Sequence, residues 1–159
     1  RQAGAGRLAV VDLSPARLAM AEGLGAERTL DARRGDVLAG LRDFSGGAGV
    51  DVAIDAVGAS STRDLAVRSI RKGGECVWLG LHDDATTVGG LDIVLGERAI
   101  YGSFSGRPAD LRAALGLLAA KRIRLEPWVK SFPLADGVRV FQELVHNPPD
   151  DYVKAVLIP

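Results

Sequence analysis

The stretch RLAVVDLSPARLAMAEGLG, residues 7–25, decides the fold class. Residues 7–12 form a short apolar run that is typical of a buried strand. A helix is predicted over 14–25, because Ser14 suits the N-cap, Pro15 the first helical position and Gly25 the helix end. A strand that runs almost directly into a helix is the repeating unit of parallel α/β sheets.

The same alternation of strand and helix continues along the chain. Further strands are predicted over residues 28–31, 50–58, 75–81 and 99–104. Helices are predicted over 35–47 and 61–72, the latter ending at Gly73-Gly74, and a short helix or turn over 91–97. The strands are continuous apolar runs, so we expect both faces of a mostly parallel sheet to be covered.

The last third of the chain has a different pattern. A helix is predicted over 108–122, an extended segment over 125–134 and a closing strand over 152–159. Residues 135–145 predict an amphipathic helix that points Val138, Phe141 and Val145 inward.

Composition excludes several classes of protein. The chain has 159 residues, about the length of one domain, and a formal net charge of zero. This balance gives no support for a nucleic-acid or membrane-surface partner. A single cysteine and two histidines cannot form a four-ligand structural zinc site. Apolar runs are too short to span a bilayer, and we expect a cytoplasmic protein.

Asp12, at the end of the first predicted strand, is the first candidate ligand-binding residue. In doubly wound sheets, ligands lie across the carboxyl ends of the strands. A carboxylate there can accept hydrogen bonds from the ribose hydroxyls of adenosine and would repel a 2′-phosphate, which favours NAD over NADP. Arg17 lies one helical turn further on and could approach the adenosine end. The competing interpretation is that Asp12 simply faces solvent and Arg17 is a surface residue.

Small residues end the later strands. They occur in AVG (56–58), LGL (79–81) and YGSF (101–104). Glycines allow a flat ligand to approach the backbone closely, and exposed backbone N–H and C=O groups suit a nicotinamide carboxamide.

Taken together, the chain resembles the C-terminal half of the medium-chain, zinc-type alcohol dehydrogenases. The stretches that carry the resemblance are VVDLSPARLAMAEGLGAE, GAGVDVAIDAVG, IRKGGECVWLGL, AIYGSFSG, LEPWVKSFPLADGVRVFQEL and VKAVLIP. The resemblance implies a Rossmann-like doubly wound parallel sheet that lacks its first strand, over residues 1–105. Residues 106–159 would be a return segment that belongs to the substrate domain.

The resemblance also implies roles for individual residues. Asp12 and Arg17 resemble the ribose-binding acid and its basic neighbour. Val57 and Gly58 resemble the turn beside the adenine and its ribose. The remaining implied positions are Leu79, Gly80 and Leu81 beside the nicotinamide, Ala99 and Tyr101 at its carboxamide, and Lys154 near the pyrophosphate.

Two features of the family are missing from this sequence. The catalytic zinc ligands and the G-x-G-x-x-G turn both precede the matching region. Without the first strand, strands 8–12 and 50–55 each lose a neighbour, and an unpaired buried amide costs about 1–3 kcal/mol. We therefore expect the chain to be part of a longer enzyme. If it is ordered alone, either another strand fills the gap or these two strands pair directly.

Three further residues have competing interpretations. Cys76 is predicted to be a core residue. His82 follows LGL, close to the expected nicotinamide, but loop histidines are more often solvated. Asp55 lies near the ligand edge, where it could contact the cofactor or a loop amide.

The sequence thus predicts the cofactor-binding portion of an NAD-dependent alcohol dehydrogenase, with zinc and the alcohol or carbonyl substrate held by the rest of the enzyme. We expect no turnover from this chain by itself and a homo-oligomer formed through the edge strand 99–104. One alternative is a zinc-free quinone or enoyl reductase relative that uses NADPH. Another is a non-catalytic nucleotide-binding or assembly module.

Overall fold

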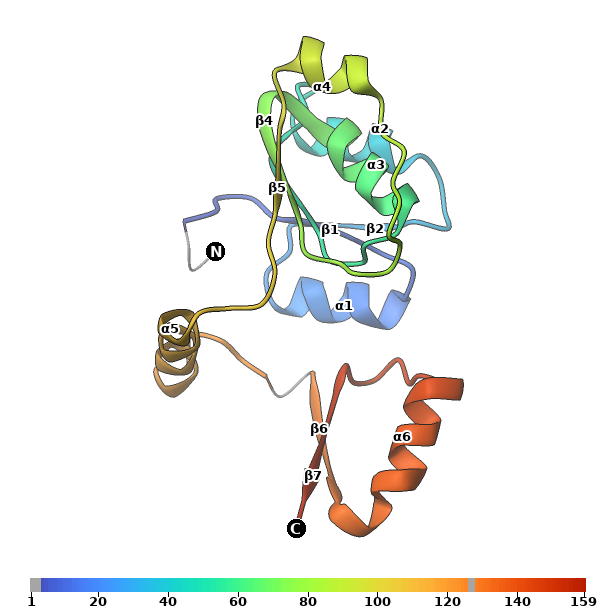
Figure 1. Ribbon diagram of the computed structural model, residues 1–159, viewed down its shortest axis with the longest axis vertical. Helices are drawn as coiled ribbons and strands as arrows, with labels where there is room; N and C mark the ends of the chain where they lie inside the picture. The colour runs from blue at the N-terminus through green and yellow to red at the C-terminus, as the bar shows by residue number, and fades with distance from the viewer. Residues whose placement is uncertain (1–3, 126–127) are drawn as a thin grey trace. The chain divides into compact units, whose positions relative to one another are not determined.

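The computed structural model describes residues 4–125 and 128–159, which form two compact units (Figure 1). The first unit combines the chain up to Arg33 with Arg107–Pro159, and the second is Arg34–Gly106. This division follows spatial contacts, so the domain boundary between residues 105 and 106 stays a prediction. Within the described ranges, no helix is both long enough and apolar enough to cross a bilayer.

The first unit begins with a β-α-β arrangement. Strand β1 (Ala9–Asp12), helix α1 (Pro15–Gly23) and strand β2 (Arg28–Asp31) follow one another, and the two strands pair in parallel. Ser14 is the N-cap of α1, and its side chain accepts a hydrogen bond from the Arg17 N–H. Gly25 has a φ of 99° just beyond the helix end, a position where helices commonly end in the left-handed backbone conformation. The predicted start and end of this helix are confirmed.

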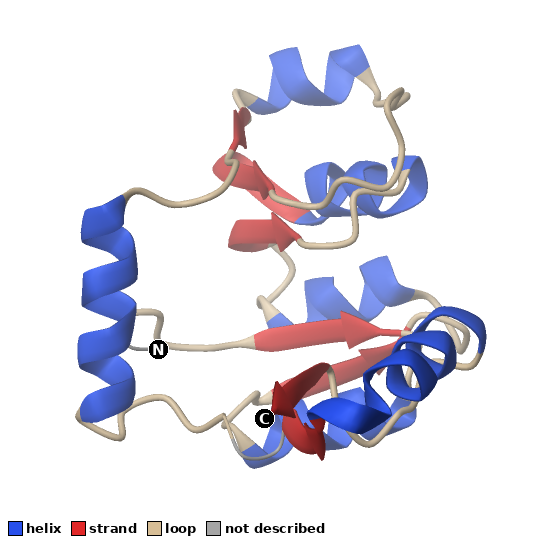
Figure 2. Ribbon diagram, turned by 60° about the horizontal axis from the view of Figure 1, so that its bottom comes forward, coloured by secondary structure: helices blue, strands red, loops and turns tan. Residues whose placement is uncertain are grey.

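The rest of the first unit is built from the C-terminal part of the chain. Its elements are α5 (Pro108–Ala119), β6 (Val129–Pro133), a short 3₁₀ helix η1 (Leu134–Asp136), α6 (Gly137–His146) and β7 (Lys154–Ile158). Strands β6 and β7 pair in parallel, and α6 lies beside them (Figure 2). Helix α5 buries none of its residues.

The predicted inner face of α6 is wrong. Val138, Phe141 and Val145 are exposed, whereas Val140 is 2% exposed. At about 100° per residue, Val140 lies on a different side of the helix from these three residues. The helix is buried through Gly137, Val140 and Leu144, which follow i, i+3, i+7 spacing and are half-buried or buried. Both sides of α6 carry apolar residues, so the sequence pattern alone did not select the buried one.

The second unit contains the larger sheet. Its elements are α2 (Val37–Phe44), β3 (Val50–Asp55), α3 (Ser60–Ser69), β4 (Ile70–Trp78), α4 (Gly90–Gly96) and β5 (Ala99–Gly102). The strand order is β3-β4-β5, and both pairings are parallel. The α/β class with parallel strands is thus confirmed.

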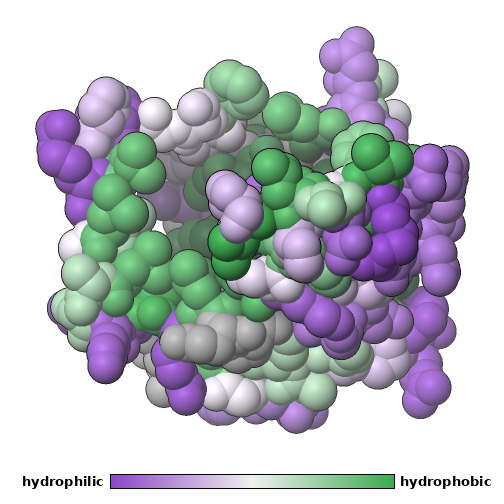
Figure 3. Space-filling view, turned by 90° about the horizontal axis from the view of Figure 1, so that it is seen from below, coloured by the Kyte–Doolittle hydropathy of each residue, from purple (hydrophilic) through white to green (hydrophobic). Residues whose placement is uncertain are grey.

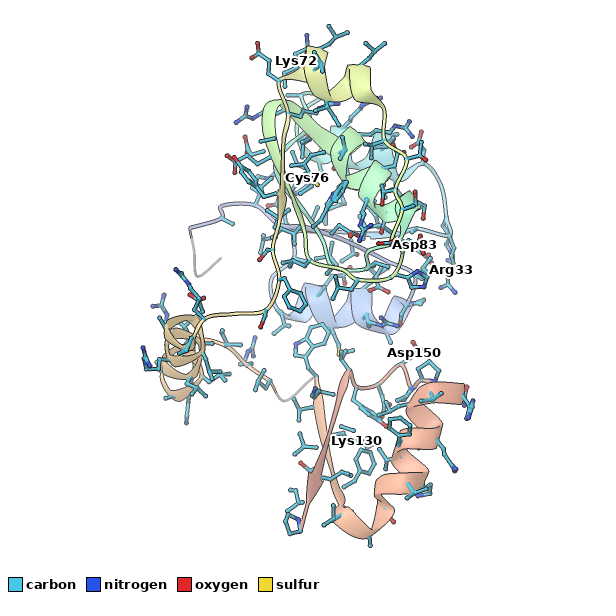
Figure 4. All side chains as sticks on the ribbon, in the orientation of Figure 1. Arg33, Lys72, Cys76, Asp83, Lys130 and Asp150 are labelled. Atoms are coloured by element: carbon cyan, nitrogen blue, oxygen red, sulfur yellow. The ribbon has the colours of Figure 1, made fainter. Side chains whose placement is uncertain are left out.

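The core of the second unit lies between α3 and the sheet. Val67, Ile70 and Cys76 are its buried centre, and Ala53 and Trp78 pack against them. Figure 4 shows Cys76 within this unit, and the thiol is fully buried. Cys76 is therefore the core residue that the sequence predicted.

The junction of α3 and β4 differs from the prediction. In the structure the helix ends at Ser69, and the strand runs from Ile70 to Trp78. The sequence predicted a helix that ends at residue 72 and a strand over 75–81. Ile70 pairs with Val50 and Glu75 with Val52, so residues 71–74 form a bulge. Gly73, with a φ of 63°, lies in this bulge and does not end the helix.

One face of β3 is also more open than predicted. Val52 is 52% exposed and Ile54 is 62% exposed, whereas Asp55 on the opposite face is buried. The packed core of this unit lies on the α3 side of the sheet, so the expectation that both faces are covered is wrong for β3. Apolar residues at the molecular surface are also visible in the view of Figure 3.

The expected pairing across the missing first strand does not occur. Strand β1 pairs with β2 through α1, and β3 pairs with β4 through α3. Within residues 4–125 and 128–159, no strand pairs with the other edge of β1 or of β3. Neither the direct pairing nor a substitute strand is therefore found among the described strands.

Candidate functional site

The turn after β1 holds Asp12 in one conformation. Its Oδ1 accepts a hydrogen bond from the Ser14 N–H at 2.8 Å, and its Oδ2 lies 3.9 Å from Arg17 Nη1. The Ser14 hydroxyl in turn donates to Asp150 Oδ1 at 2.8 Å, with Ser14 buried. The Asp12 side chain is 28% exposed, so its carboxylate remains accessible to a ligand.

The carboxyl ends of β3 and β4 are joined by a set of hydrogen bonds. Asp55 is 5% exposed, and its Oδ2 accepts from the Gly58 N–H at 2.8 Å. The Asp55 carbonyl accepts from Leu79 N at 2.8 Å and from Gly80 N at 3.1 Å. Asp55 thus contacts loop amides, one of the two possibilities left open by the sequence.

Two glycines allow these turns to meet. A Cβ on Gly58 would lie 2.2 Å from the Gly80 carbonyl carbon, and a Cβ on Gly80 would lie 2.0 Å from Gly58 N. Gly58 also has a φ of 86°, which L side chains rarely adopt. Glycine is therefore required at both positions for backbone-to-backbone packing.

Arg63, on the first turn of α3, reaches the loop that follows β4. Its Nη1 donates to the Asp83 carbonyl at 2.9 Å and to Thr86 Oγ1 at 2.7 Å, and its Nη2 donates to the Gly80 carbonyl at 3.0 Å. The residue is 8% exposed, and its guanidinium carbon lies 5.2 Å from the centre of the Trp78 ring. A buried cation thus connects one helix to three points of a single loop.

The same loop carries a histidine–aspartate pair. His82 Nδ1 lies 2.8 Å from Asp83 Oδ1, and Asp83 Oδ2 accepts from the Ser60 N–H at 2.8 Å. The Ser60 N–H bond, followed by the bond to His82, lowers the pKa of Asp83 below its ordinary value. His82 is largely exposed, and Figure 4 shows Asp83 in the loop beyond β4.

Comparison with known proteins decides the family. A family model described as zinc-binding dehydrogenase matches residues 1–120. The chain belongs to the zinc-binding dehydrogenase family. The resemblance to the C-terminal half of these enzymes, seen in the sequence, is therefore confirmed.

Curated relatives of this zinc-binding dehydrogenase chain act on polyols or alcohols according to their names. Human sorbitol dehydrogenase is 31% identical over 143 residues, which cover 87% of this chain and 40% of that enzyme. D-arabitol-phosphate dehydrogenase of Enterococcus avium is 32% identical over 135 residues, which cover 82% of this chain and 38% of that enzyme. The chain thus spans about two fifths of the length of these relatives.

Solved structures support the same conclusion. The 2R,3R-butanediol dehydrogenase of Bacillus subtilis is 29% identical, with a TM-score of 0.88 over 99% of this chain and 45% of that one. A Sinorhizobium meliloti 1021 structure, assigned as a zinc-binding dehydrogenase and bound to NADP, is 27% identical, with a TM-score of 0.87 over 100% of this chain and 47% of that one. The Rossmann-like fold is thereby confirmed.

The structure places the candidate residues of this family member in separate groups. Asp12 and Arg17 lie together at the end of β1. The turns at 57–58 and 79–81 lie together in the second unit, where Val57, Leu79 and Leu81 are exposed and the two glycines are buried. Ala99 and Tyr101 lie on β5, opposite Glu75 and Val77. No described hydrogen bond or ion pair connects Lys154, on β7, to Asp12. The cofactor contacts of all these residues stay predictions.

Sequence reasoning missed Arg63 and Ser60. One signal was available, because Arg63, Val67 and Ile70 follow the i, i+4, i+7 spacing of a buried helix face. A charged residue on an apolar stripe needs polar partners once it is buried. Those partners are carbonyls of a loop about twenty residues later, which a helical pattern does not reveal.

The family description implies zinc, and the described residues contain no ligand set that fits it. Among the residues that the structure describes, no three His, Cys, Asp or Glu side chains gather as potential metal ligands. Cys76 is buried in the core, and burial raises the pKa of its thiol, which disfavours the thiolate that a metal needs. No step of a reaction is therefore assigned to zinc within this chain.

Proposed function

We propose that this chain is the cofactor-binding portion of a zinc-type, NAD-dependent alcohol dehydrogenase. The observation that carries the proposal is the Asp12 carboxylate at the carboxyl end of β1, held by the Ser14 N–H and still partly exposed. A carboxylate in this position accepts hydrogen bonds from the two ribose hydroxyls and repels a 2′-phosphate. Arg17 already faces this carboxylate, which reduces its ability to neutralise a phosphate.

The second unit would bind the nicotinamide half. Backbone groups of the turns at 57–58 and 79–81, with Ala99 and Tyr101 on β5, would orient the ring and its carboxamide. A bound nicotinamide dinucleotide supplies the hydride acceptor or donor for interconversion of an alcohol and a carbonyl compound. The described residues offer no zinc ligand set, so the groups that activate the alcohol would come from another part of the enzyme. The chain alone would then bind cofactor without turnover.

NADP use is the second candidate, and one observation favours it. The Sinorhizobium meliloti relative at 27% identity is bound to NADP. Arg17 is 46% exposed at its side chain and could turn from Asp12 toward a 2′-phosphate. The two candidates differ in which dinucleotide binds more tightly to the wild-type chain.

We also propose that a second copy of the chain pairs through residues 99–104. Strand β5 pairs with β4 at one edge, and no other described strand pairs with it. Exposed strand edges of this kind readily pair with another chain. Sedimentation velocity should show a dimer that strengthens with concentration, and a monomer over the whole concentration range would contradict this proposal.

Titration of the chain with NADH and NADPH tests the cofactor assignment. Loss of a hydrogen bond to a charged group costs about 1.5–3 kcal/mol, so Asp12→Ala should weaken NADH about tenfold to a hundredfold. NADPH affinity should stay equal or rise, because a repulsive charge is removed. Asp136→Ala is the matched control, since Asp136 is a surface acid of the same unit that also pairs with an arginine. Tighter NADPH than NADH binding by the wild-type chain would refute NAD selection.

A further inference from the structure

Arg63 has a bonding pattern that the cofactor assignment does not use. All three of its hydrogen bonds go to the loop after β4, at Gly80, Asp83 and Thr86. A guanidinium has five N–H donors in a rigid planar fork, so three fixed acceptors define its position and theirs. The fork therefore restrains three points of the loop at once.

The surroundings of Arg63 make this arrangement rigid. The residue is 8% exposed, stacks near Trp78 and has Asp55 Oδ2 4.0 Å from its Nε. The Nε itself has no hydrogen-bond partner although it is buried. The buried cation is compensated by the loop acceptors together with the Asp55 carboxylate, so the loop and the arginine hold each other in place.

Ser60 adds a second attachment of the loop to α3. Its N–H donates to Asp83 Oδ2 at 2.8 Å, and its hydroxyl accepts from the Thr87 N–H at 3.2 Å. The loop from 80 to 87 is thus attached to the first turn of α3 by side-chain and backbone bonds, and the exposed Leu79 and Leu81 stand at its beginning.

We propose that Arg63 is a positioning residue that fixes the loop after β4 for the nicotinamide half of the cofactor. The inference rests on the proposed function, because that function places the nicotinamide beside residues 79–81. Arg63 acts through the loop and touches no reacting atom. The adenosine half is assigned to Asp12 and Arg17, which belong to the first unit, whereas Arg63 and the loop belong to the second. Loss of Arg63 should therefore weaken nicotinamide-dependent affinity selectively.

The test compares NADH with ADP-ribose, which lacks the nicotinamide. Binding to the 159-residue chain is followed by Trp fluorescence for NADH and by calorimetry for both ligands. Arg63→Met should weaken NADH about tenfold and change ADP-ribose less than about twofold. Arg63→Lys should recover part of the loss, because it keeps the charge but not the fork. Arg68→Met is the matched control, since Arg68 lies exposed on the same helix.

A second variant keeps the test valid in the case that Arg63→Met does not fold. Thr86→Val removes one acceptor of the arginine and leaves the buried charge in place. It should weaken NADH by about threefold, and Thr87→Val, its neighbour, should not. Amide hydrogen exchange without ligand should become faster over residues 80–87 in Arg63→Met and Thr86→Val.

The outcomes separate the two proposals. If the wild-type chain binds neither NADH nor ADP-ribose, the proposed function fails and this inference fails with it. If NADH binds but Arg63→Met and Thr86→Val leave its affinity unchanged, only this inference is overturned. Equal loss of NADH and ADP-ribose affinity in Arg63→Met would also overturn it, because the residue would then serve the fold alone. If Arg63→Met does not fold, Thr86→Val decides.

Discussion

Replacing Gly58 by alanine should destabilise the second unit by about 3 kcal/mol, because it adds backbone strain and weakens two hydrogen bonds. The residue has a φ of 86°, and a left-handed conformation costs an L residue about 1–2 kcal/mol. The new Cβ would lie 2.2 Å from the Gly80 carbonyl carbon, where ordinary contact begins at 3.4 Å, so the two turns must separate. Separation weakens the bonds Gly58 N–Asp55 Oδ2 and Asp83 N–Gly58 O, each worth about 0.5–1.5 kcal/mol.

Urea unfolding followed by Trp78 fluorescence measures this loss. The background variant Trp128→Phe removes the second tryptophan, so the signal reports the second unit. Gly46→Ala is the matched control for the φ cost alone, since Gly46 has a φ of 70° and no atom within 4 Å of a new Cβ. Gly102→Ala, with open space and no positive φ, should change little. Equal destabilisation by Gly58→Ala and Gly46→Ala would refute the role of close packing.

Three further predictions concern single side chains. Ser14→Ala should lower the free energy of unfolding of the first unit by about 1–2 kcal/mol, because the α1 N-cap and the hydrogen bond to Asp150 are both lost. An unchanged thermal unfolding curve would contradict the stabilising role of the cap. The pKa of Asp83 is lower in the native state than in the unfolded state, so its carboxylate stabilises the loop above the unfolded pKa. This stabilisation is lost as pH falls through the native pKa. Asp83→Asn should remove this acid dependence from hydrogen exchange at the Ser60 amide, and an unchanged pH profile in the variant would contradict the prediction. The buried Cys76 thiol, with its raised pKa, should react with a thiol reagent only as fast as the chain unfolds, and rapid labelling under native conditions would show that the core is open.

The sequence predicted the elements whose signals are local. Ser14 caps α1 as expected, because a cap depends on a side chain and the N–H three residues later. The burial of Cys76 also followed from a short apolar run. These features need no knowledge of distant parts of the chain.

The features that sequence reasoning missed depend on partners far along the chain. Gly73-Gly74 looked like a helix end but lies in a bulge, because Ile70 pairs with Val50 across the sheet. Arg63 looked like an ordinary helical residue, and its role appears only when the loop after β4 folds back onto α3. The exposed Val138 likewise shows that the apolar pattern of α6 allows two contact faces, and only the folded structure selects the side that holds Val140.

The bond between Asp12 Oδ1 and the Ser14 N–H has a consequence for the entropy of ligand capture. An unrestrained side chain must give up its rotamer freedom on association, at about 0.5–1.5 kcal/mol. In the proposed function, folding would already have restrained the Asp12 side chain through this bond, so a ribose hydroxyl would meet a preorganised acceptor. Under the same proposal, a bulkier or charged sugar could displace the carboxylate only by first breaking the turn between Asp12 and Ser14.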